Sequence, residues 1–486
     1  MMHEQTFDAI VIGAGLGGLL SAAQLLQRGK HVAVIERLPR CGGRFTAKTF
    51  QGVQVSTGAV HMVPFGSSGV LARMLSRLRI PYRFFDADVF GSFHVHGKQY
   101  RARGLLGVYA FLGPRQFFWF ARLGYLMFLR PLPSSERDLP FDRWLARHIN
   151  VARNPQLVAF FERISRFALS LELRQVSTAE VIETTKNMLR FGAPGIVEGG
   201  CARLTHAIEQ RLREQGAALY LRTEVMQILA ADDRVTGVRV RDKQAGAESQ
   251  LRAPLVVSDI GPRATNGLLD NRKVTQAEVL HTVPGEERDA GWEEAIGLKV
   301  HMLSDVSLIP HKGIMYCLDT RRIAGMVQPT NSDPRLAPPG KHLLISHQVI
   351  QSRDIEEEKA LALADLRAMF GAAFDEHCRV LTMSAYRGEW PVNRAAQGED
   401  VRAETDVPGL YLVGDAVKPS GYLMVEGVAQ SVNQLLDLLD AVELNKDAEP
   451  PVRIRRHKVP RRPRNVTRPP SRLNALRWLF EAPGNS

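Results

Sequence analysis

The sequence is poor in cysteine and has no recognisable metal-binding motif. Its 486 residues include only four cysteines, which are far apart and form no Cys-x-x-Cys pair: Cys41, Cys201, Cys317 and Cys378. This spacing argues against a disulfide framework and against a zinc or iron–sulfur site. It is typical of a reducing cytoplasm, which is the compartment we expect. The sequence also lacks Gly-x-Ser-x-Gly, so a serine nucleophile of that type is not predicted.

Long apolar runs are scarce as well. Residues 9–27 are uncharged and mostly apolar, and the run is long enough to resemble a membrane span or a signal peptide. Residues 1–8 contain no Lys or Arg, however, and a glycine-rich turn interrupts the run. We interpret the segment as a strand, a turn and a helix. The sequence therefore predicts no transmembrane helix.

Most of the chain has little net charge. The formal total is +12, but residues 451–486 contain ten basic residues and one acidic residue, a charge of +9. The other 450 residues carry only +3. A uniformly basic surface for nucleic acid is therefore not expected, and no nucleic-acid partner is predicted. The charge belongs instead to a basic, Pro-rich tail that we place at residues 446–486.

The amino terminus carries a dinucleotide-binding pattern. Residues 7–12 (FDAIVI) predict a buried parallel strand, and Gly13, Gly15 and Gly18 follow it as Gly-x-Gly-x-x-Gly. An amphipathic helix and a second strand come next, and Glu36 closes that strand. In this context the glycines allow a tight turn and a close approach of pyrophosphate, while the carboxylate binds ribose hydroxyls. An acid at this position favours FAD or NAD over NADP.

The same stretch resembles a known family once the next loop is included. Gly42, Gly43 and Arg44 follow Glu36, and together with the glycine motif they are similar to the fingerprint of the flavin amine oxidase and phytoene desaturase superfamily. The resemblance implies FAD as the cofactor, with Arg44 near its pyrophosphate, where a planar guanidinium can bind two oxygens. The cysteine that binds flavin covalently in part of that family is absent here. We therefore expect non-covalent FAD.

Two later segments resemble further parts of the family's FAD site. Residues 194–262 resemble the second segment, in which a valine matching Val225 contacts the adenine. In the third, an acid matching Asp415 binds the ribityl chain, and residues 424–427 lie at a helix start facing the flavin, where a positive dipole end suits the anionic reduced ring. The cofactor-binding residues implied in this way are Gly13, Gly15, Leu16, Gly17, Gly18, Glu36, Arg37, Gly43, Arg44, Val225, Gly414, Asp415, Met424, Val425 and Gly427.

The order of these segments predicts an α/β protein with a discontinuous Rossmann-like FAD-binding domain, an inserted α+β substrate domain and a helical cap. We assign residues 1–70, 194–262 and 380–445 to the FAD-binding domain. Residues 71–193 are expected to form a helical, membrane-facing substrate region. Residues 263–379 are expected to supply the substrate-domain sheet and its helices.

Three side chains are candidates for the chemistry beside the flavin. Lys299 lies in a pattern similar to the family strand that carries a lysine near flavin N5; the alternative is a strand lysine that points to solvent. His61 follows a segment that lies beside the flavin ring in the family, or else it is a core histidine. Tyr422 is a candidate for one ring of an aromatic pair around an amine, with Tyr386 or Trp390 as the second ring.

Residues 104–133 indicate contact with a membrane. They combine many aromatic residues with arginines at intervals of seven or eight, a composition typical of an interfacial helix, although a buried cap helix is the alternative. The basic tail ends in a second basic and aromatic cluster, residues 473–480. Two such elements favour a cytoplasmic protein attached peripherally to an anionic membrane, where an apolar substrate is found.

Three functions remain open from the sequence. The first is an FAD-dependent oxidoreductase that desaturates or saturates carbon–carbon bonds of a polyprenoid or carotenoid-like substrate. The second is an amine oxidase that acts on a small amine or polyamine. The third is a flavin-free lipid-binding chaperone similar to the Rab GDP-dissociation inhibitors, against which the intact cofactor motifs argue.

Overall fold

The computed structural model describes residues 4–58, 60–102, 104–269, 294–395, 398 and 401–447. Its first part is built on a five-stranded parallel sheet with the order β11-β3-β2-β15-β21. The strands are β2 (Ala9–Ile12), β3 (Val32–Glu36), β11 (Ala218–Leu221), β15 (Val256–Ser258) and β21 (Leu410–Leu412). They come from the three stretches that the sequence analysis assigned to FAD binding, so the predicted α/β fold is confirmed.

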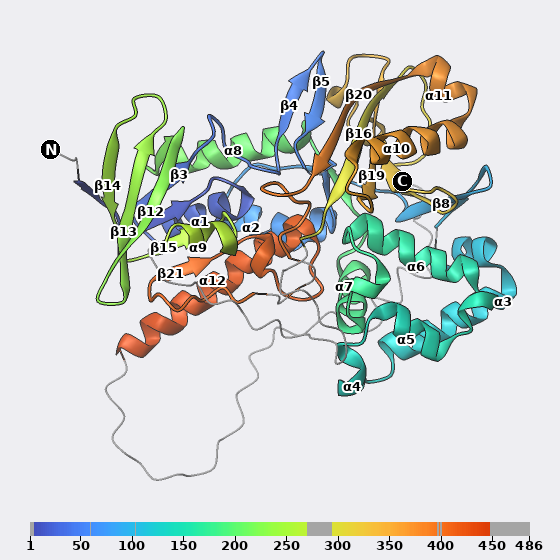
Figure 1. Ribbon diagram of the computed structural model, residues 1–486, viewed down its shortest axis with the longest axis horizontal. Coiled ribbons are helices and arrows are strands. Elements are labelled where there is room, and N and C mark those ends of the chain that lie inside the picture. The colour runs from blue at the N-terminus through green and yellow to red at the C-terminus, as the bar shows by residue number, and fades with distance from the viewer. Residues whose placement is uncertain are drawn as a thin grey trace, which may run out of the picture.

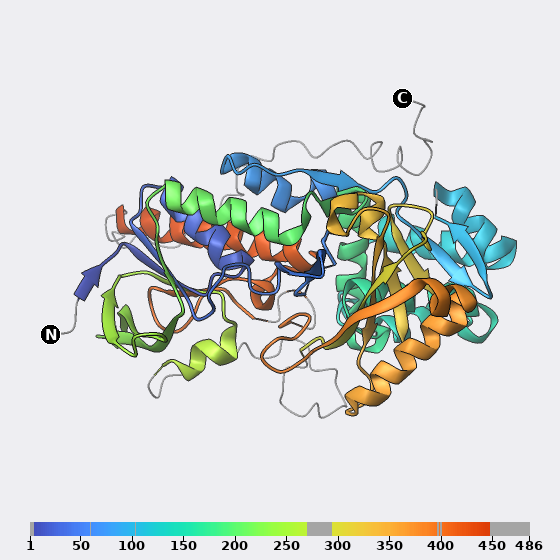
Figure 2. The same cartoon turned by 90° about the horizontal axis from the view of Figure 1, so that it is seen from above.

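Strand β2 is the point in this sheet at which the order of the strands reverses. From β2 the chain passes through α1 (Leu16–Gln27) to β3 on one side, while β15 pairs with β2 on the other side. Helix α1 packs between α8 (Gly200–Glu214) and α12 (Met424–Asp447), and the two views show the three helices side by side (Figure 1; Figure 2). Open α/β sheets bind their ligands in the crevice at such a switch point, outside the carboxyl ends of the strands.

Smaller sheets flank this parallel sheet. A four-stranded sheet with the order β1-β14-β13-β12 packs beside it and contains the antiparallel pair of β12 and β13. Its strands are β1 (Glu4–Thr6), β12 (Thr223–Ala231), β13 (Arg234–Asp242) and β14 (Glu248–Arg252). The remaining short strands are β4 (Ala47–Phe50), β5 (Val53–Ser56), β6 (Met62–Val63), β7 (Phe84–Asp86) and β10 (Gly195–Val197).

The second part of the fold is a seven-stranded sheet with the order β20-β16-β19-β18-β17-β8-β9. Its strands are β8 (Gly91–Val95), β9 (Lys98–Arg101), β16 (Gly297–Ser304), β17 (Ile314–Cys317), β18 (Ile323–Val327), β19 (His342–Val349) and β20 (Cys378–Tyr386). Strands β8 and β9 lie in the stretch expected to be helical. The expectation of a purely helical region was therefore wrong for these residues. Strand β8 pairs with β17, which is far away in the sequence, and no local pattern predicts such a pairing.

The two faces of this sheet belong to different cores. Leu298, Val300 and Met302 on β16 pack in the same cluster as α10 (Ile355–Phe370). Because neighbouring side chains on a strand point to opposite faces, Lys299 and His301 face the other way, toward the interior between this sheet and the FAD-binding part. The helix α6 (Pro155–Ala168) packs against β17, β18 and β19.

The helices between residues 104 and 191 form the predicted cap. They are α3 (Gly104–Phe128), α4 (Ser134–Arg137), α5 (Phe141–His148) and α7 (Thr178–Phe191), together with α6. Helix α2 (Val70–Arg77) packs instead on α12, and the described residues also form α9 (Pro262–Gly267) and α11 (Ala372–His377). Helix α3 is kinked at Gly113, which has φ of 68° and precedes Pro114. Proline lacks the backbone N–H of a helical residue, which explains the break.

Helix α3 combines both of the interpretations that the sequence left open. Its Phe111 is buried and stacks on Phe93 of β8, with 4.6 Å between ring centroids. Leu106 and Phe118, by contrast, are 83% and 62% exposed. One side of α3 is therefore a cap helix in the core, while the other presents apolar groups to solvent.

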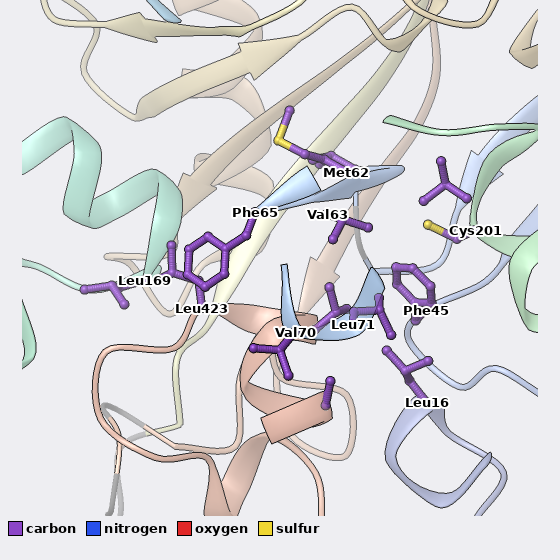
Figure 3. Close-up of a cluster of buried hydrophobic side chains, with 14 of the residues drawn as sticks. Leu16, Phe45, Met62, Val63, Phe65, Val70, Leu71, Leu169, Cys201 and Leu423 are labelled. Carbon is purple, nitrogen blue, oxygen red and sulfur yellow. The ribbon is translucent and has the colours of Figure 1, made fainter. Parts of the chain in front are cut away.

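A large apolar cluster joins the cap to the FAD-binding part. Figure 3 shows Leu16 at the start of α1, Phe65 after β6 and Leu423 before α12 as members of this cluster. Phe65 also stacks on Phe191 of α7, at 4.9 Å between centroids. Burying a large apolar side chain contributes roughly 1.5–3 kcal/mol, so these contacts fix α12 relative to the cap.

No helix in the part of the chain that the structure describes is both long and apolar enough to cross a bilayer. The basic tail predicted at 446–486 lies outside the described residues, apart from its first two, which continue α12.

Candidate functional site

A cavity of about 580 Å³ lies between the parallel sheet and the seven-stranded sheet. This volume is within the usual range for a binding site, roughly 300–1,000 Å³. Its wall begins at the carboxyl ends of β2, β3 and β15, at Ile12, Glu36 and Asp259. It extends to Lys299 and Tyr386 of the seven-stranded sheet. The cavity therefore connects the predicted nucleotide site to the predicted substrate side.

The glycine loop after β2 has the geometry that the sequence predicted. Gly13 has φ of +93°, which L side chains rarely adopt, and a Cβ atom on Gly18 would overlap the carbonyl oxygen of Gly13. Gly42 N–H donates to the carbonyl of Ala14 at 2.7 Å, so the second glycine loop lies directly against the first. The amino terminus of α1 thereby faces the cavity, where its dipole favours an anion.

Glu36 is buried at the end of β3 and lines the cavity. Its carboxylate accepts hydrogen bonds from the N–H groups of Ala14 at 2.9 Å and Leu38 at 2.8 Å. The next residue, Arg37, also lines the cavity and pairs with Glu389 at 3.0 Å. The acid is thus fixed beside the glycine loop, in the position that ribose recognition requires.

Two arginines and an aspartate form a charged group in the cavity wall. Arg44 Nη2 donates to Asp415 Oδ1 at 2.6 Å, and the backbone N–H of Arg394 donates to Asp415 Oδ2 at 2.8 Å. Burial alone would raise the pKa of Asp415, but the charges of Arg44 and Arg394 outweigh it and hold the pKa well below its usual range. Asp415 is therefore ionised. Arg44 Nη1 also donates to the carbonyls of Pro391 and Val392, at 2.9 Å each, which fixes this guanidinium in the cavity wall.

Asp259, directly after β15, is a second acid in this wall. Its Oδ2 accepts a hydrogen bond from the N–H of Gly18 at 2.9 Å. Burial raises the pKa of its carboxyl to about 7, against the opposing effects of the Gly18 N–H and of Arg394. The cluster thus contains one ionised acid, Asp415, and one acid that is half protonated near neutral pH.

The other predicted cofactor residues divide into two groups. Residues that line the cavity include Gly13, Gly15, Leu16, Gly17, Gly43, Val225, Met424 and Val425. Gly18 and Gly414 lie behind this surface, where they support the glycine loop and Asp259. Gly427 is different, because it lies in the first turn of α12, packs against Lys418 and does not line the cavity. Its prediction as a direct cofactor contact is not supported by this geometry.

Lys299 faces the cavity and not the solvent. Its side chain is buried, and Nζ lies 4.8 Å from the ring centroid of Tyr386. Burial, together with the charge of Arg44, lowers the pKa of the ammonium to about 7. Lys299 is therefore a side chain that gains or loses a proton near neutral pH, as a general acid or base must.

His61 and Tyr422, the other two catalytic candidates, lie elsewhere. His61 is completely buried, its Nε2 bonds the carbonyl of Gln54 at 2.7 Å, and its Nδ1 accepts from the N–H of Cys201 at 3.2 Å. Both ring nitrogens are thus used by the backbone, which corrects the prediction that His61 lies at the flavin. Tyr422 packs against Phe65 and does not line the cavity, so its proposed role in an aromatic pair is also corrected.

The residues present fit FAD. A carboxylate for the ribose, a helix amino terminus and two guanidinium groups for the pyrophosphate line one continuous cavity. Glu36, Arg44, Arg394 and the first turn of α1 would hold the nucleotide. Val225 would lie on the adenine side, and Met424 and Val425, at the start of α12, on the flavin side.

Comparison with known proteins decides the family. Residues 16–431 match the family model described as flavin containing amine oxidoreductase. The chain belongs to this family. It is therefore an FAD-dependent oxidoreductase. This finding removes the flavin-free lipid-binding chaperone from the three hypotheses.

Individual relatives of this oxidoreductase cover nearly all of it. A neurosporene-forming phytoene desaturase of Rhodobacter capsulatus is 26% identical over 524 residues, which covers 88% of this chain and 93% of the relative. An uncharacterized protein of Methanocaldococcus jannaschii is 29% identical over 432 residues, covering 89% and 99%. An oxidoreductase from Methanosarcina mazei, known from its crystal structure, is 32% identical with a TM-score of 0.77, covering 90% and 100%. Putrescine oxidase, at 16% identity and a TM-score of 0.65, shares the fold.

Several residues of the cavity were not predicted from the sequence. Asp259 directly follows a parallel strand next to β2, and this position is the signal that could have identified it. Arg394 and Glu294 lie in irregular segments with no periodic pattern, so no local signal pointed to them. His347 lies in a mostly apolar strand, whose pattern does not indicate a site residue. Only the pairing of β19 with β16 places it beside Lys299.

Proposed function

We propose that this oxidoreductase desaturates, or in the reverse direction saturates, carbon–carbon bonds of a polyprenoid or carotenoid-like substrate. The observation that carries the proposal is the apolar portion of the cavity wall: Val60, Met62, Phe167, Val392, Val425 and Val428. Such a wall excludes water and aligns a hydrocarbon chain by shape. The similarity to phytoene desaturases over most of the chain agrees with this substrate class.

The chain's own residues would position and protect the reaction. When bound, FAD supplies a hydride acceptor or donor at N5. The apolar wall would hold the reacting carbon and keep solvent out. Lys299 would hold a proton on Nζ below pH 7 and be neutral above it, because its pKa is lowered to about 7.

The test is product analysis on a membrane-like support. Purified holoenzyme is incubated with carotenoid precursors in liposomes, once with an electron acceptor and once with a reductant, and double bonds are counted by absorption and mass spectrometry. A change in either direction is expected. An unchanged double-bond count under both conditions would exclude the proposal.

Oxidation of a small amine or polyamine is the second candidate. Tyr386 and Trp390 both line the cavity, and Lys299 lies against the Tyr386 ring, so aromatic rings are available to flank an amine. This activity would generate hydrogen peroxide from polyamines or aromatic amines, with no dependence on added lipid. Peroxide formation under these conditions, with no carotenoid product, would favour it over the first.

We also propose that the enzyme binds an anionic membrane surface through α3 and the basic tail. Leu106, Phe118 and Leu129 are 83%, 62% and 74% exposed. The exposed arginines Arg115 and Arg122 alternate with these apolar groups along α3 and the residues that follow it. Apolar groups that enter the headgroup region, with guanidinium groups beside them, suit anionic lipids.

A further inference from the structure

The carboxyl group of Asp259 occupies a notch that three glycines form at the phosphate-binding end of the cavity. A Cβ atom on Gly15, Gly17 or Gly414 would collide with the oxygens of this carboxyl. The three glycines therefore leave room for Asp259 as well as for a cofactor. Asp259 is itself part of the cavity wall.

This position is the one in which dinucleotide sites hold the pyrophosphate. The N–H of Gly18, in the first turn of α1, already donates to Asp259 Oδ2 at 2.9 Å. Helix amino termini of this type bind anions, and FAD brings a doubly charged pyrophosphate to the same place. An ionised Asp259 would repel that group at short range. A neutral carboxylic acid can accept from Gly18 with one oxygen and donate its proton to a phosphate oxygen with the other.

The charged neighbours of Asp259 make this state possible. Asp415, at the start of the 3₁₀ helix Asp415–Val417 after β21, is held ionised by Arg44 and Arg394, so these two cations are shared with another acid. Glu294 also faces the two arginines, together with Arg263. Burial already raises the pKa of Asp259 to about 7 in the protein alone, and the negative charge of Asp415 acts in the same direction.

We propose that Asp259 is a cofactor-binding residue that holds the FAD pyrophosphate as a neutral carboxylic acid. Binding of FAD then fixes one proton on this side chain, and release of FAD at alkaline pH returns that proton to solvent. No redox step is involved. The affinity for FAD is therefore constant at acid pH and declines above the pKa of Asp259 in the free protein.

The experiment measures FAD dissociation from the full-length holoenzyme between pH 6 and pH 8.5. Serial dilution at each pH, followed by the fluorescence of released FAD, gives the Kd. The Kd should be constant below about pH 7 and rise up to about tenfold per pH unit above it. Proton release on dissociation, followed with an indicator dye in weak buffer, should approach one proton per FAD at the upper end of the range.

Two variants identify the group. Asp259→Asn keeps the shape and cannot ionise, so its Kd should not vary with pH, and at pH 8.5 it should bind FAD more tightly than the wild type. Glu294→Gln, at another acid of the same wall, should keep the wild-type pH dependence. The proposal is wrong if the wild-type Kd is independent of pH, if no proton is released, or if Glu294→Gln and not Asp259→Asn removes the dependence. If Asp259→Asn fails to fold, a wild-type Kd that is independent of pH, or FAD release without a proton, still overturns the proposal.

Discussion

Lys299 and His347 are direct partners across the antiparallel strands β16 and β19, and both side chains line the cavity. Burial lowers the pKa of His347 to about 3 and that of Lys299 to about 7. His347 is thus neutral throughout the physiological range. Within this pair, Lys299 is the residue whose charge changes near neutral pH, and the pair supplies one switchable positive charge to the cavity.

The redox potential of the flavin should depend on that charge. A protonated Lys299 favours the more negative reduced flavin, so Lys299→Met should lower the two-electron potential at pH 6 by about 30 mV, which corresponds to roughly 1.4 kcal/mol. At pH 8.5 Lys299 is neutral in the wild type, and the two potentials should converge. Spectroscopic titration against indicator dyes measures both values.

The matched control for this experiment is Lys48→Met, at an exposed lysine on β4. It should leave the potential unchanged at both pH values. A difference between wild type and Lys299→Met that is equally large at pH 6 and pH 8.5 would contradict a pKa near 7 for Lys299.

The buried pair of Arg44 and Asp415 should matter for stability as well as for FAD. Asp415→Asn leaves the Arg44 guanidinium in a buried site without its counter-charge, a change that typically costs about 3–5 kcal/mol. Denaturant unfolding of the FAD-free protein should show this loss, and FAD retention on gel filtration should fall. The side chains of this pair are 19% and 7% exposed.

An exposed ion pair of the same composition serves as the control. Arg28 and Asp440 lie 2.6 Å apart with side chains 33% and 52% exposed. Asp440→Asn should change the free energy of unfolding by no more than about 1 kcal/mol, since solvent screens such pairs. Equal effects of the two substitutions would show that Arg44 does not depend on Asp415.

His61 should behave as a structural residue. His61→Ala removes the partners of the Gln54 carbonyl and the Cys201 N–H, and leaving buried polar groups unpaired costs about 1–3 kcal/mol each. The variant should therefore unfold at lower denaturant concentration. Its Kd for FAD, measured by dilution of the folded holoenzyme, should remain within about twofold of the wild type. Weaker FAD binding without a loss of stability would show instead that His61 contacts the cofactor.

The exposed apolar face of α3 should contribute to membrane binding. Replacing Leu106 and Phe118 by Ser should reduce co-sedimentation with anionic vesicles, and so should deletion of residues 451–486. Raised salt should weaken the electrostatic part, because exposed charges are screened over about 10 Å at 0.1 M ionic strength. Absorbance of the bound flavin in the pellet gives the bound fraction.

A matched surface control is available on the hairpin of β4 and β5. Phe50 is 44% exposed there, away from α3 (Figure 1). Phe50→Ser should leave vesicle binding unchanged. Binding that is insensitive to the α3 substitutions, to the tail deletion and to salt would refute the membrane proposal.

Local sequence patterns predicted the nucleotide end of the cavity well, because that end is made from contiguous motifs. The glycine loop and Glu36 lie within one β-α-β unit, in which spacing fixes geometry. Arg44 lies in the loop after β3 and was implied by the family resemblance. Asp415 was implied by the family resemblance, and it lies shortly after the apolar strand β21. Strands of this type are recognised by their uninterrupted apolar runs.

The substrate end was harder to predict because it depends on long-range pairing. Whether Lys299 faces solvent or the cavity depends on which face of β16 meets α10, and no residue near Lys299 encodes that choice. His61 had the expected sequence context, yet the backbone of residues 54 and 201 uses both of its nitrogens. Arg394 reaches the site from an irregular loop, for which periodicity gives no signal.

The parallel sheet also constrains how the enzyme is made. Asp415, which lies shortly after the edge strand β21, comes 371 residues after its partner Arg44. During synthesis, β2, β3 and the glycine loop are made long before β21 and Asp415. The sheet and its charged cluster are therefore incomplete until most of the chain has been synthesised. Such distant pairing slows folding and exposes apolar strands in the meantime. FAD therefore meets a complete binding site only after β21 and Asp415 have been synthesised.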